Sequence, residues 1–244
     1  MTRFLLLGSR AEDIAADGEY AAFLRFSGLR ADELDRVRME QASFLPVPLD
    51  DYDGVIVGGS PYDASTPQAA KSPAQVRVEA EMATLLDEIV DRDWPFLGAC
   101  YGVGTLGVHQ GGVIDRTYPE PISAVTITLT DAGQVDPLLA DLPRSFDAFV
   151  GHKEACSVLP PGAVLLASSP TCPVQMFRVR TNLYATQFHP ELDLPGIITR
   201  IGVYRDYGYF QPQEHDDVVE GVRTADVWAP PRILEAFVRR YRRD

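Results

Sequence analysis

The sequence predicts a three-layer α/β fold: a mostly parallel central sheet covered by helices on both faces, with a small antiparallel sheet portion. Short apolar runs at residues 4–7, 55–57 and 94–98 end at or just before a glycine, as buried strands do. Longer amphipathic segments alternate with these runs in the first half of the chain. Beyond residue 121 the pattern changes to closely spaced strand-like segments separated by proline and glycine turns.

Three amphipathic segments have the spacing and end signals of helices. Residues 19–26 carry apolar side chains at helical spacing and stop near Gly28, a residue type that commonly follows a helix. The pair Ser72-Pro73 predicts a helix start, and apolar residues lie on one face of residues 76–90. Residues 231–243 predict a last helix, whose arginines suit the negative C-terminal end of a helix dipole.

The middle of the chain predicts an antiparallel part of the same domain. Its candidate strands are short and rich in β-branched or apolar residues, and they span residues 122–129, 146–150, 163–167, 174–179 and 183–188.

The segment from residue 192 to residue 228 has a weak, polar pattern that assigns it to neither helix nor strand. It contains four aromatic residues close to two arginines: Tyr204, Tyr207, Tyr209 and Phe210, with Arg200 and Arg205. Aromatic residues and arginine together are typical of interfaces. The segment is therefore interpreted as a lid, a contact between subunits or an extra packing layer.

Length and composition limit the organisation and the partners of the chain. With 244 residues and 45% hydrophobic content, residues 1–244 are expected to form a single domain, with an extension at about 192–229 before the last helix. A net charge of −13 disfavours binding to nucleic acid or to a membrane surface. Three cysteines, an odd number, favour a reducing cytoplasm over a disulfide scaffold. The apolar run at residues 4–7 is too short for a signal peptide.

The segment 96–104 places one cysteine between a strand and a helix. Cys100 lies in the turn, and the glycines around it, Gly98 and Gly102, allow the backbone to pass close by. A cysteine at a helix N-terminus feels the positive end of the dipole, which favours the reactive thiolate. Cys100 is therefore a candidate nucleophile, although a small buried cysteine in a glycine-rich turn has the same pattern.

The segment 185–191 places a histidine and a carboxylate two residues apart. His189 precedes a proline and is expected to be extended, so that His189 and Glu191 point to the same side. The carboxylate can then orient the imidazole, and the imidazole can take a proton from a thiol. On its own, this segment also fits a surface turn.

The two segments together resemble the class I glutamine amidotransferases. In this family the nucleophile lies in a G-x-C-x-G turn and the histidine and glutamate in an H-P-E run, here Cys100 and His189–Glu191, which are roughly 90 residues apart. The strand and Gly-Gly loop at residues 55–61 also match. Nearly the whole span 4–191 follows the family's order of elements, and the glutaminase portion of GMP synthase is the most similar type.

The resemblance implies a flavodoxin-like fold and a cysteine-dependent amidohydrolase. Cys100 would attack the side-chain amide of glutamine and form a γ-glutamyl thioester, with His189 relaying the proton. The backbone N–H groups of Gly59 and Tyr101 would stabilise the oxyanion. The resemblance implies neither a metal nor a cofactor, and no histidine and cysteine cluster of the sequence has the spacing of metal ligands.

The sequence departs from the family where the family helps to hold its substrate. The family pattern is C-x-G-x-Q, and Gly104 stands in place of the glutamine, so one polar contact is missing. Either another group replaces that contact or the substrate is a different γ-glutamyl compound. The candidate substrate-binding residues are Gly58, Gly104, His152 and Gln187.

Three functions remain as alternatives. The first is a glutaminase that supplies ammonia to a partner synthetase, as in GMP synthase, because the chain carries no nucleotide-binding fingerprint of its own. The second is a stand-alone hydrolase of γ-glutamyl peptides or amides, which Gly104 favours. The third is a non-catalytic regulatory module, which the complete set of Cys100, His189 and Glu191 disfavours.

Overall fold

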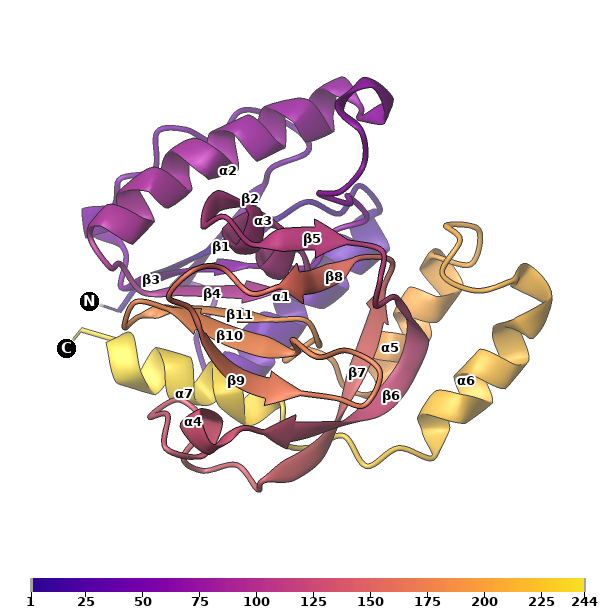
Figure 1. Cartoon of the computed structure of the whole chain (residues 1–244). Helices are drawn as coiled ribbons and strands as arrows, with labels where there is room; N and C mark the ends of the chain where they lie inside the picture. The colour runs from indigo at the N-terminus through magenta and orange to yellow at the C-terminus, as the bar shows by residue number, and fades with distance from the viewer. Residues whose placement is uncertain (1, 244) are drawn as a thin grey trace.

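The protein, described here by a computed structural model of residues 2–243, is built on one nine-stranded mixed sheet (Figure 1). Across the sheet the strands are β2 (Leu34–Arg38), β1 (Phe4–Gly8), β3 (Gly54–Val57), β4 (Phe96–Ala99), β11 (Leu183–Thr186), β10 (Met176–Val179), β9 (Val164–Ser168), β6 (Glu120–Leu129) and β7 (Ser145–His152). A separate antiparallel pair consists of β5 (Val113–Asp115) and β8 (Ala155–Val158).

The direction of the strands changes half-way across the large sheet. From β2 to β11 every neighbouring pair is parallel, and from β11 to β7 every pair is antiparallel. The predicted α/β class, with its antiparallel middle region, is confirmed, although the sheet is mixed rather than mostly parallel. The short apolar runs predicted β1, β3 and β4, whereas β11, which was expected in the antiparallel part, pairs parallel with β4 and antiparallel with β10.

Helices cover both faces of the sheet. They are α1 (Asp13–Ser27), α2 (Pro73–Asp91), α3 (Tyr101–His109), α4 (Asp131–Gln134), α5 (Leu194–Val203), α6 (His215–Arg223) and α7 (Pro231–Tyr241), with 3₁₀ turns at Leu49–Asp51, Gln68–Ala70 and Pro212–Glu214. Ser72 caps α2 by accepting a hydrogen bond from the Gln75 N–H, as the Ser-Pro signal predicted. Within residues 2–243, no helix is long and apolar enough to span a bilayer.

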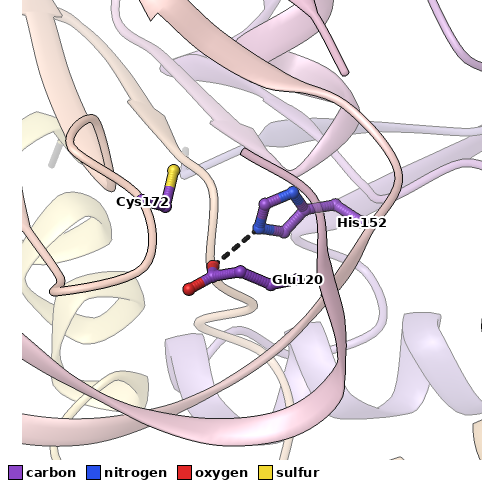
Figure 2. A group of neighbouring side chains, drawn as sticks. All are labelled: Glu120, His152 and Cys172. Atoms are coloured by element: carbon purple, nitrogen blue, oxygen red, sulfur yellow. Dashed lines mark hydrogen bonds and ion pairs between the residues drawn. The ribbon is translucent and has the colours of Figure 1, made fainter. Parts of the chain in front are cut away.

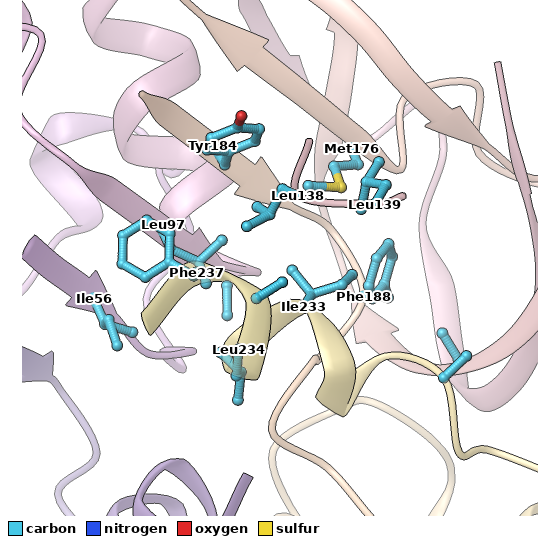
Figure 3. Close-up of a cluster of buried hydrophobic side chains, with 14 of the residues drawn as sticks. Ile56, Leu97, Leu138, Leu139, Met176, Tyr184, Phe188, Ile233, Leu234 and Phe237 are labelled. Carbon is cyan, nitrogen blue, oxygen red and sulfur yellow. The ribbon is translucent and has the colours of Figure 1, made fainter. Parts of the chain in front are cut away.

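The core lies in two main layers because successive strand residues face opposite sides of the sheet. Phe4 and Leu6 of β1 pack with α1 and α7, whereas Leu5 and Leu7 pack with α2 and α3. In the first layer, Phe237 and the other buried apolar residues of α7 lie over side chains of the middle strands (Figure 3).

The extension contains two helices that the sequence pattern did not reveal. At one end of the molecule, α5 and α6 cover the antiparallel strands β6 and β7 (Figure 1). Ile197, Ile201 and Val222 of these helices pack on Ile122 and Phe149. This third apolar layer anchors the extension to the sheet.

The parallel half of the sheet brings three loops to one edge. Strands β3, β4 and β11 run in the same direction, and Val57, Gly98 and Ala185 lie in register. Ligands commonly bind beyond the carboxyl ends of parallel strands. The segments that directly follow these strands start at Gly58, Cys100 and Gln187.

Candidate active site

Cys100 lies in a strained turn between β4 and α3. Its backbone has φ 53° and ψ −82°, a conformation that residues other than glycine rarely adopt. Its N–H donates to the Thr186 carbonyl over 2.7 Å, which ties the turn to β11. A Cβ on Gly98 would lie 2.6 Å from the Gly102 Cα, so the turn requires glycine there. The predicted glycine-flanked turn is therefore present.

His189 and Glu191 form a buried pair just beyond β11. The His189 N–H donates to the Phe149 carbonyl of β7 over 3.0 Å, which fixes the backbone at this point. The His189 Nδ1 lies 2.9 Å from the Glu191 Oε1, and Glu191 is fully buried. The two side chains therefore face each other as predicted, but the expected extended backbone is absent: Pro190 and Glu191 lie in a turn, in which the Leu192 N–H donates to the His189 carbonyl over 3.4 Å.

Cys100 lies between two small cavities that together bring the candidate residues into one region. One cavity, of about 30 Å³, is lined by Cys100, His189 and Arg200. The other, of about 20 Å³, is lined by Cys100 and Gln187, among others. Tyr209 lines both cavities, and each has room for about one water molecule.

Arg200 of α5 contacts both members of the His189–Glu191 pair. One of its terminal nitrogens lies 3.0 Å from the His189 Nδ1, and the other donates to the Glu191 Oε1 over 2.8 Å. A guanidinium can only donate hydrogen bonds. The Nδ1 atom therefore either accepts from Arg200 or donates to Glu191, and the second tautomer leaves Nε2 free to accept a proton.

A second buried ion pair lies behind Arg200. Glu19 of α1 accepts from Arg200 over 3.1 Å and from Arg10 over 2.8 Å. Arg10 in turn donates to the Tyr204 hydroxyl of the extension over 2.9 Å. The two arginines balance Glu19 and Glu191, so that each buried charge has an opposite partner.

The Gly-Gly loop after β3 leaves space for this network. A Cβ on Gly58 would lie 2.5 Å from the Glu19 Oε2, and a Cβ on Gly59 would lie 2.7 Å from the His189 Cε1. Gly58, predicted to bind substrate, thus adjoins Glu19. Gly59, predicted to contribute to the oxyanion hole, adjoins His189, and within residues 2–243 its N–H donates to no protein group.

The protonation states differ from the thiolate that the helix position predicted. Burial raises the pKa of the Cys100 thiol to about 12, and the nearby Arg10 lowers it only in part. Burial lowers the pKa of His189 below its ordinary value, although Glu191 opposes this. At neutral pH the pair is therefore a thiol and a neutral imidazole. The helix position therefore does not give the expected thiolate, because burial, together with Glu191 and Glu154, raises the pKa of Cys100.

Glu191 is charged despite its burial. Burial alone would raise the pKa of Glu191, but His189 and Arg200 hold it well below the ordinary range. A permanent carboxylate at this position stabilises an imidazolium that forms on His189 during proton transfer.

Gln187 and Tyr101 border the thiol. The Gln187 Nε2 lies 3.9 Å from the Cys100 Sγ, and its Oε1 is buried with no partner in the described part of the chain. Tyr101 is the first residue of α3, so its N–H has no acceptor within the helix. Both positions offer polar groups to a ligand at the thiol.

His152 lines the same cavity as Cys100, but both of its ring nitrogens bond to protein. The Nδ1 atom lies 2.9 Å from the Glu154 carbonyl, and the Nε2 atom lies 2.7 Å from the Glu120 Oε2 (Figure 2). The imidazole thus forms part of the cavity wall and has no ring nitrogen left for a substrate.

Glu120, His152 and Cys172 are the group of possible metal ligands within residues 2–243, with ligand atoms within 4.8 Å of one another. Figure 2 shows the Glu120 carboxylate directed at the His152 ring. Glu120 also accepts hydrogen bonds from Gln175 over 2.7 Å and from Thr171. The carboxylate is thus satisfied by protein donors, and the group forms a buried polar cluster without requiring an ion.

Sequence reasoning missed Arg10 and Glu19, and it placed Arg200 only in a segment interpreted as a lid, a subunit contact or an extra packing layer. One signal was available: Ala15, Glu19 and Phe23 have helical spacing, so that a carboxylate interrupts an apolar face. A buried carboxylate requires a cationic partner. One partner, Arg10, lies only nine residues from Glu19, whereas the other, Arg200, lies 181 residues away and has no sequence signal that connects it to Glu19.

The fold and this arrangement of side chains define a class, and comparison with known proteins agrees. A model of the family "Glutamine amidotransferase class-I" matches residues 31–195, more than half of the chain. The chain belongs to the class I glutamine amidotransferase family.

The relatives found among characterised proteins have low sequence identity to this chain, and each alignment covers only part of it. A GMP synthase from Xylella fastidiosa is 29% identical over 142 residues, which are 57% of this chain and 25% of that protein. One subunit of the glutamine-hydrolyzing GMP synthase from Thermococcus kodakarensis is 32% identical over 111 residues, 45% of this chain and 57% of the relative. The chain thus spans only about a quarter of the length of the full GMP synthases that it matches.

Solved structures agree with the fold over the whole chain. A glutamine amidotransferase from Thermotoga maritima superposes with a TM-score of 0.76 at 21% identity and covers 99% of both chains. A second, from Methylobacillus flagellatus, has a TM-score of 0.70 at 18% identity and covers 99% of this chain and 94% of its own. At these identities the likeness concerns the fold alone.

Proposed function

We propose that the protein is a cysteine-dependent glutaminase, in which Cys100, His189 and Glu191 release ammonia from the side-chain amide of glutamine. One observation carries the proposal: a cysteine in a strained turn adjoins a cavity that also contains a histidine oriented by a buried carboxylate. Membership of the class I glutamine amidotransferase family supports glutamine as the substrate.

The first half of the reaction breaks the amide bond. His189 Nε2 takes the thiol proton as the Cys100 sulfur forms a bond to the amide carbon. The carbon–nitrogen bond then breaks, the leaving nitrogen receives that proton from His189, and ammonia departs. Glu191 holds the imidazole in the required tautomer and stabilises its positive charge.

The second half regenerates the thiol. A water molecule gives a proton to His189 and attacks the thioester carbon, the carbon–sulfur bond breaks, and the sulfur regains the proton as glutamate leaves. The N–H groups of Gly59 and Tyr101 are the donors proposed for the oxyanion, because neither has an acceptor in regular structure.

Cys100 is partly exposed, but the binding of a molecule as large as glutamine beside it requires the extension to move. The two cavities beside Cys100 are smaller than glutamine, and Tyr209 lines both. Lys153 fixes the part of the extension that contains Tyr207 and Tyr209. Its Nζ donates to the Tyr207 carbonyl over 2.7 Å and lies 4.6 Å from the centre of the Tyr209 ring. Displacement of Tyr209 would join the two cavities, so we assign the extension the role of a lid.

The acceptor of the ammonia is proposed to be a separate synthetase. The relative from Thermococcus kodakarensis is named as one subunit of a GMP synthase, and such a name implies a companion chain. A stand-alone hydrolase of γ-glutamyl peptides or amides is the second candidate, and Gly104 is the observation that favours it.

An ammonia-release assay separates these functions. We expect the purified protein to release ammonia from glutamine, and we expect Cys100→Ala to release none. Hydrolysis of γ-glutamyl peptides without hydrolysis of glutamine would support the second candidate. If neither substrate is hydrolysed, with or without a synthetase recovered from native cytosol by pull-down, the glutaminase proposal is wrong.

A further inference from the structure

The cavity on the side of Cys100 that faces α3 contains a buried carboxylate that no step of the proposed reaction uses. Glu154 lies between β7 and β8, is 9% exposed and lines the same cavity as Cys100 and Gly104. A Cβ on Gly104 would lie 3.2 Å from the Glu154 Oε1. The Glu154 side chain thus reaches the place that a larger residue at position 104 would occupy.

Glu154 keeps acceptor capacity beyond its bonds to protein. Its Oε1 accepts from the Ala64 N–H and its Oε2 from the Ser65 N–H, each over 2.7 Å. Each carboxylate oxygen can accept about two hydrogen bonds, so both oxygens retain a free lone pair. An ionised carboxylate is an acceptor only, and it therefore selects a donor or a cation.

The charge of Glu154 is also incompletely compensated. Burial raises the pKa of Glu154, and the nearby Asp63 raises it further, whereas no cation is among the groups that lower it. Asp63 lines the same cavity, but its Oδ2 already accepts from Arg116 over 3.1 Å. A ligand cation would stabilise the Glu154 carboxylate, as opposite charges do at short range.

We infer that Glu154 binds the α-ammonium group of the substrate and makes the enzyme selective for γ-glutamyl amides with a free α-amino group. This inference rests on the proposed function, because it places the side-chain amide of the substrate at Cys100. Glutamine has a single cationic group, and its short aliphatic chain separates that group from the amide. Glu154 would thus supply the polar contact that Gly104 cannot.

The test compares glutamine with 4-carbamoylbutanoate, the same molecule without its α-amino group. We expect the wild-type protein to prefer glutamine in kcat/KM for ammonia release. Glu154→Gln should lower kcat/KM for glutamine about 10- to 100-fold, the range for a hydrogen bond between charged groups, and leave that for 4-carbamoylbutanoate nearly unchanged. Asp63→Asn, which removes a carboxylate already paired with Arg116, should leave the preference near the wild-type ratio.

Three outcomes would overturn the inference while the glutaminase proposal stands. In the first, the wild type has equal kcat/KM for glutamine and 4-carbamoylbutanoate. In the second, Glu154→Gln lowers kcat/KM equally for both compounds. In the third, Asp63→Asn reduces the preference for glutamine as much as Glu154→Gln does. The wild-type comparison needs no variant, so it holds even if Glu154→Gln unfolds. If neither compound is hydrolysed, calorimetry of Cys100→Ala with each compound makes the same comparison through Kd, where equal affinities contradict the inference.

Discussion

Replacing His189 with alanine is expected to lower kcat/KM for glutamine hydrolysis by about 10²- to 10⁴-fold, the contribution of a positioned general base. The reason is the thiol itself: burial raises the pKa of Cys100 well above neutral pH, so that the resting form at pH 7 is the thiol. His189 must therefore remove the proton during attack. Steady-state ammonia release at pH 7 measures the loss.

A matched control is His109→Ala, which removes a histidine at the far end of α3 that pairs with Asp87, and it should retain wild-type activity. The wild-type pH profile provides a second check. Because the pKa of His189 is lowered from 6.5, activity should stay level from pH 9 to pH 7 and fall only below pH 6.5, as the imidazole gains a proton. Activity that rises steadily from pH 7 to pH 9 would instead indicate a free thiolate as the reacting species.

Replacing Arg200 with methionine is expected to destabilise the protein and to shift its pH profile. Removal of Arg200 leaves Glu191 without a cationic partner and Glu19 with Arg10 alone. Removing one partner of a buried ion pair costs about 3–5 kcal/mol. At about 2–4 °C per kcal/mol for a chain of this size, Tm should fall by about 6–20 °C, as calorimetry can measure.

The pH profile distinguishes a role at the imidazole from a purely structural one. Arg200 lowers the pKa of His189, so its removal should raise that pKa and move the acid limb of the activity profile to higher pH. The control is Arg205→Met, which removes an exposed arginine of the same segment whose side chain, within residues 2–243, bonds only to the Pro212 carbonyl. An unchanged Tm together with an unchanged acid limb in Arg200→Met would contradict the role assigned to this network.

The parallel half of the fold was predictable because its strands are buried on both faces and appear as plain apolar runs. Strand β2 was missed because it lies at the sheet edge, where its sequence Leu-Asp-Arg-Val-Arg is half polar. Helix α5 was missed because tyrosine, aspartate and glycine surround its short apolar stretch. The order of the strands could not be predicted, since pairing joins segments far apart in the chain.

At the site, local pattern placed Cys100 in its turn and oriented His189 toward Glu191. The same pattern could not predict the resting thiol of Cys100, because a pKa depends on everything packed around the sulfur. The partners of Arg200 and the position of Glu154 beside Gly104 depend on tertiary packing between distant segments. Such contacts have no signature in a single sequence.

Treatment of the protein with a diazo-ketone analogue of glutamine, followed by peptide mass spectrometry, tests the central claim most directly. If Cys100 attacks the substrate with the help of His189, one adduct forms, on the peptide that contains Cys100, and it forms far more slowly in His189→Ala. The buried Cys156 and Cys172 remain unmodified. An adduct on either of those cysteines alone, or labelling of Cys100 at the same rate in His189→Ala, would contradict the account.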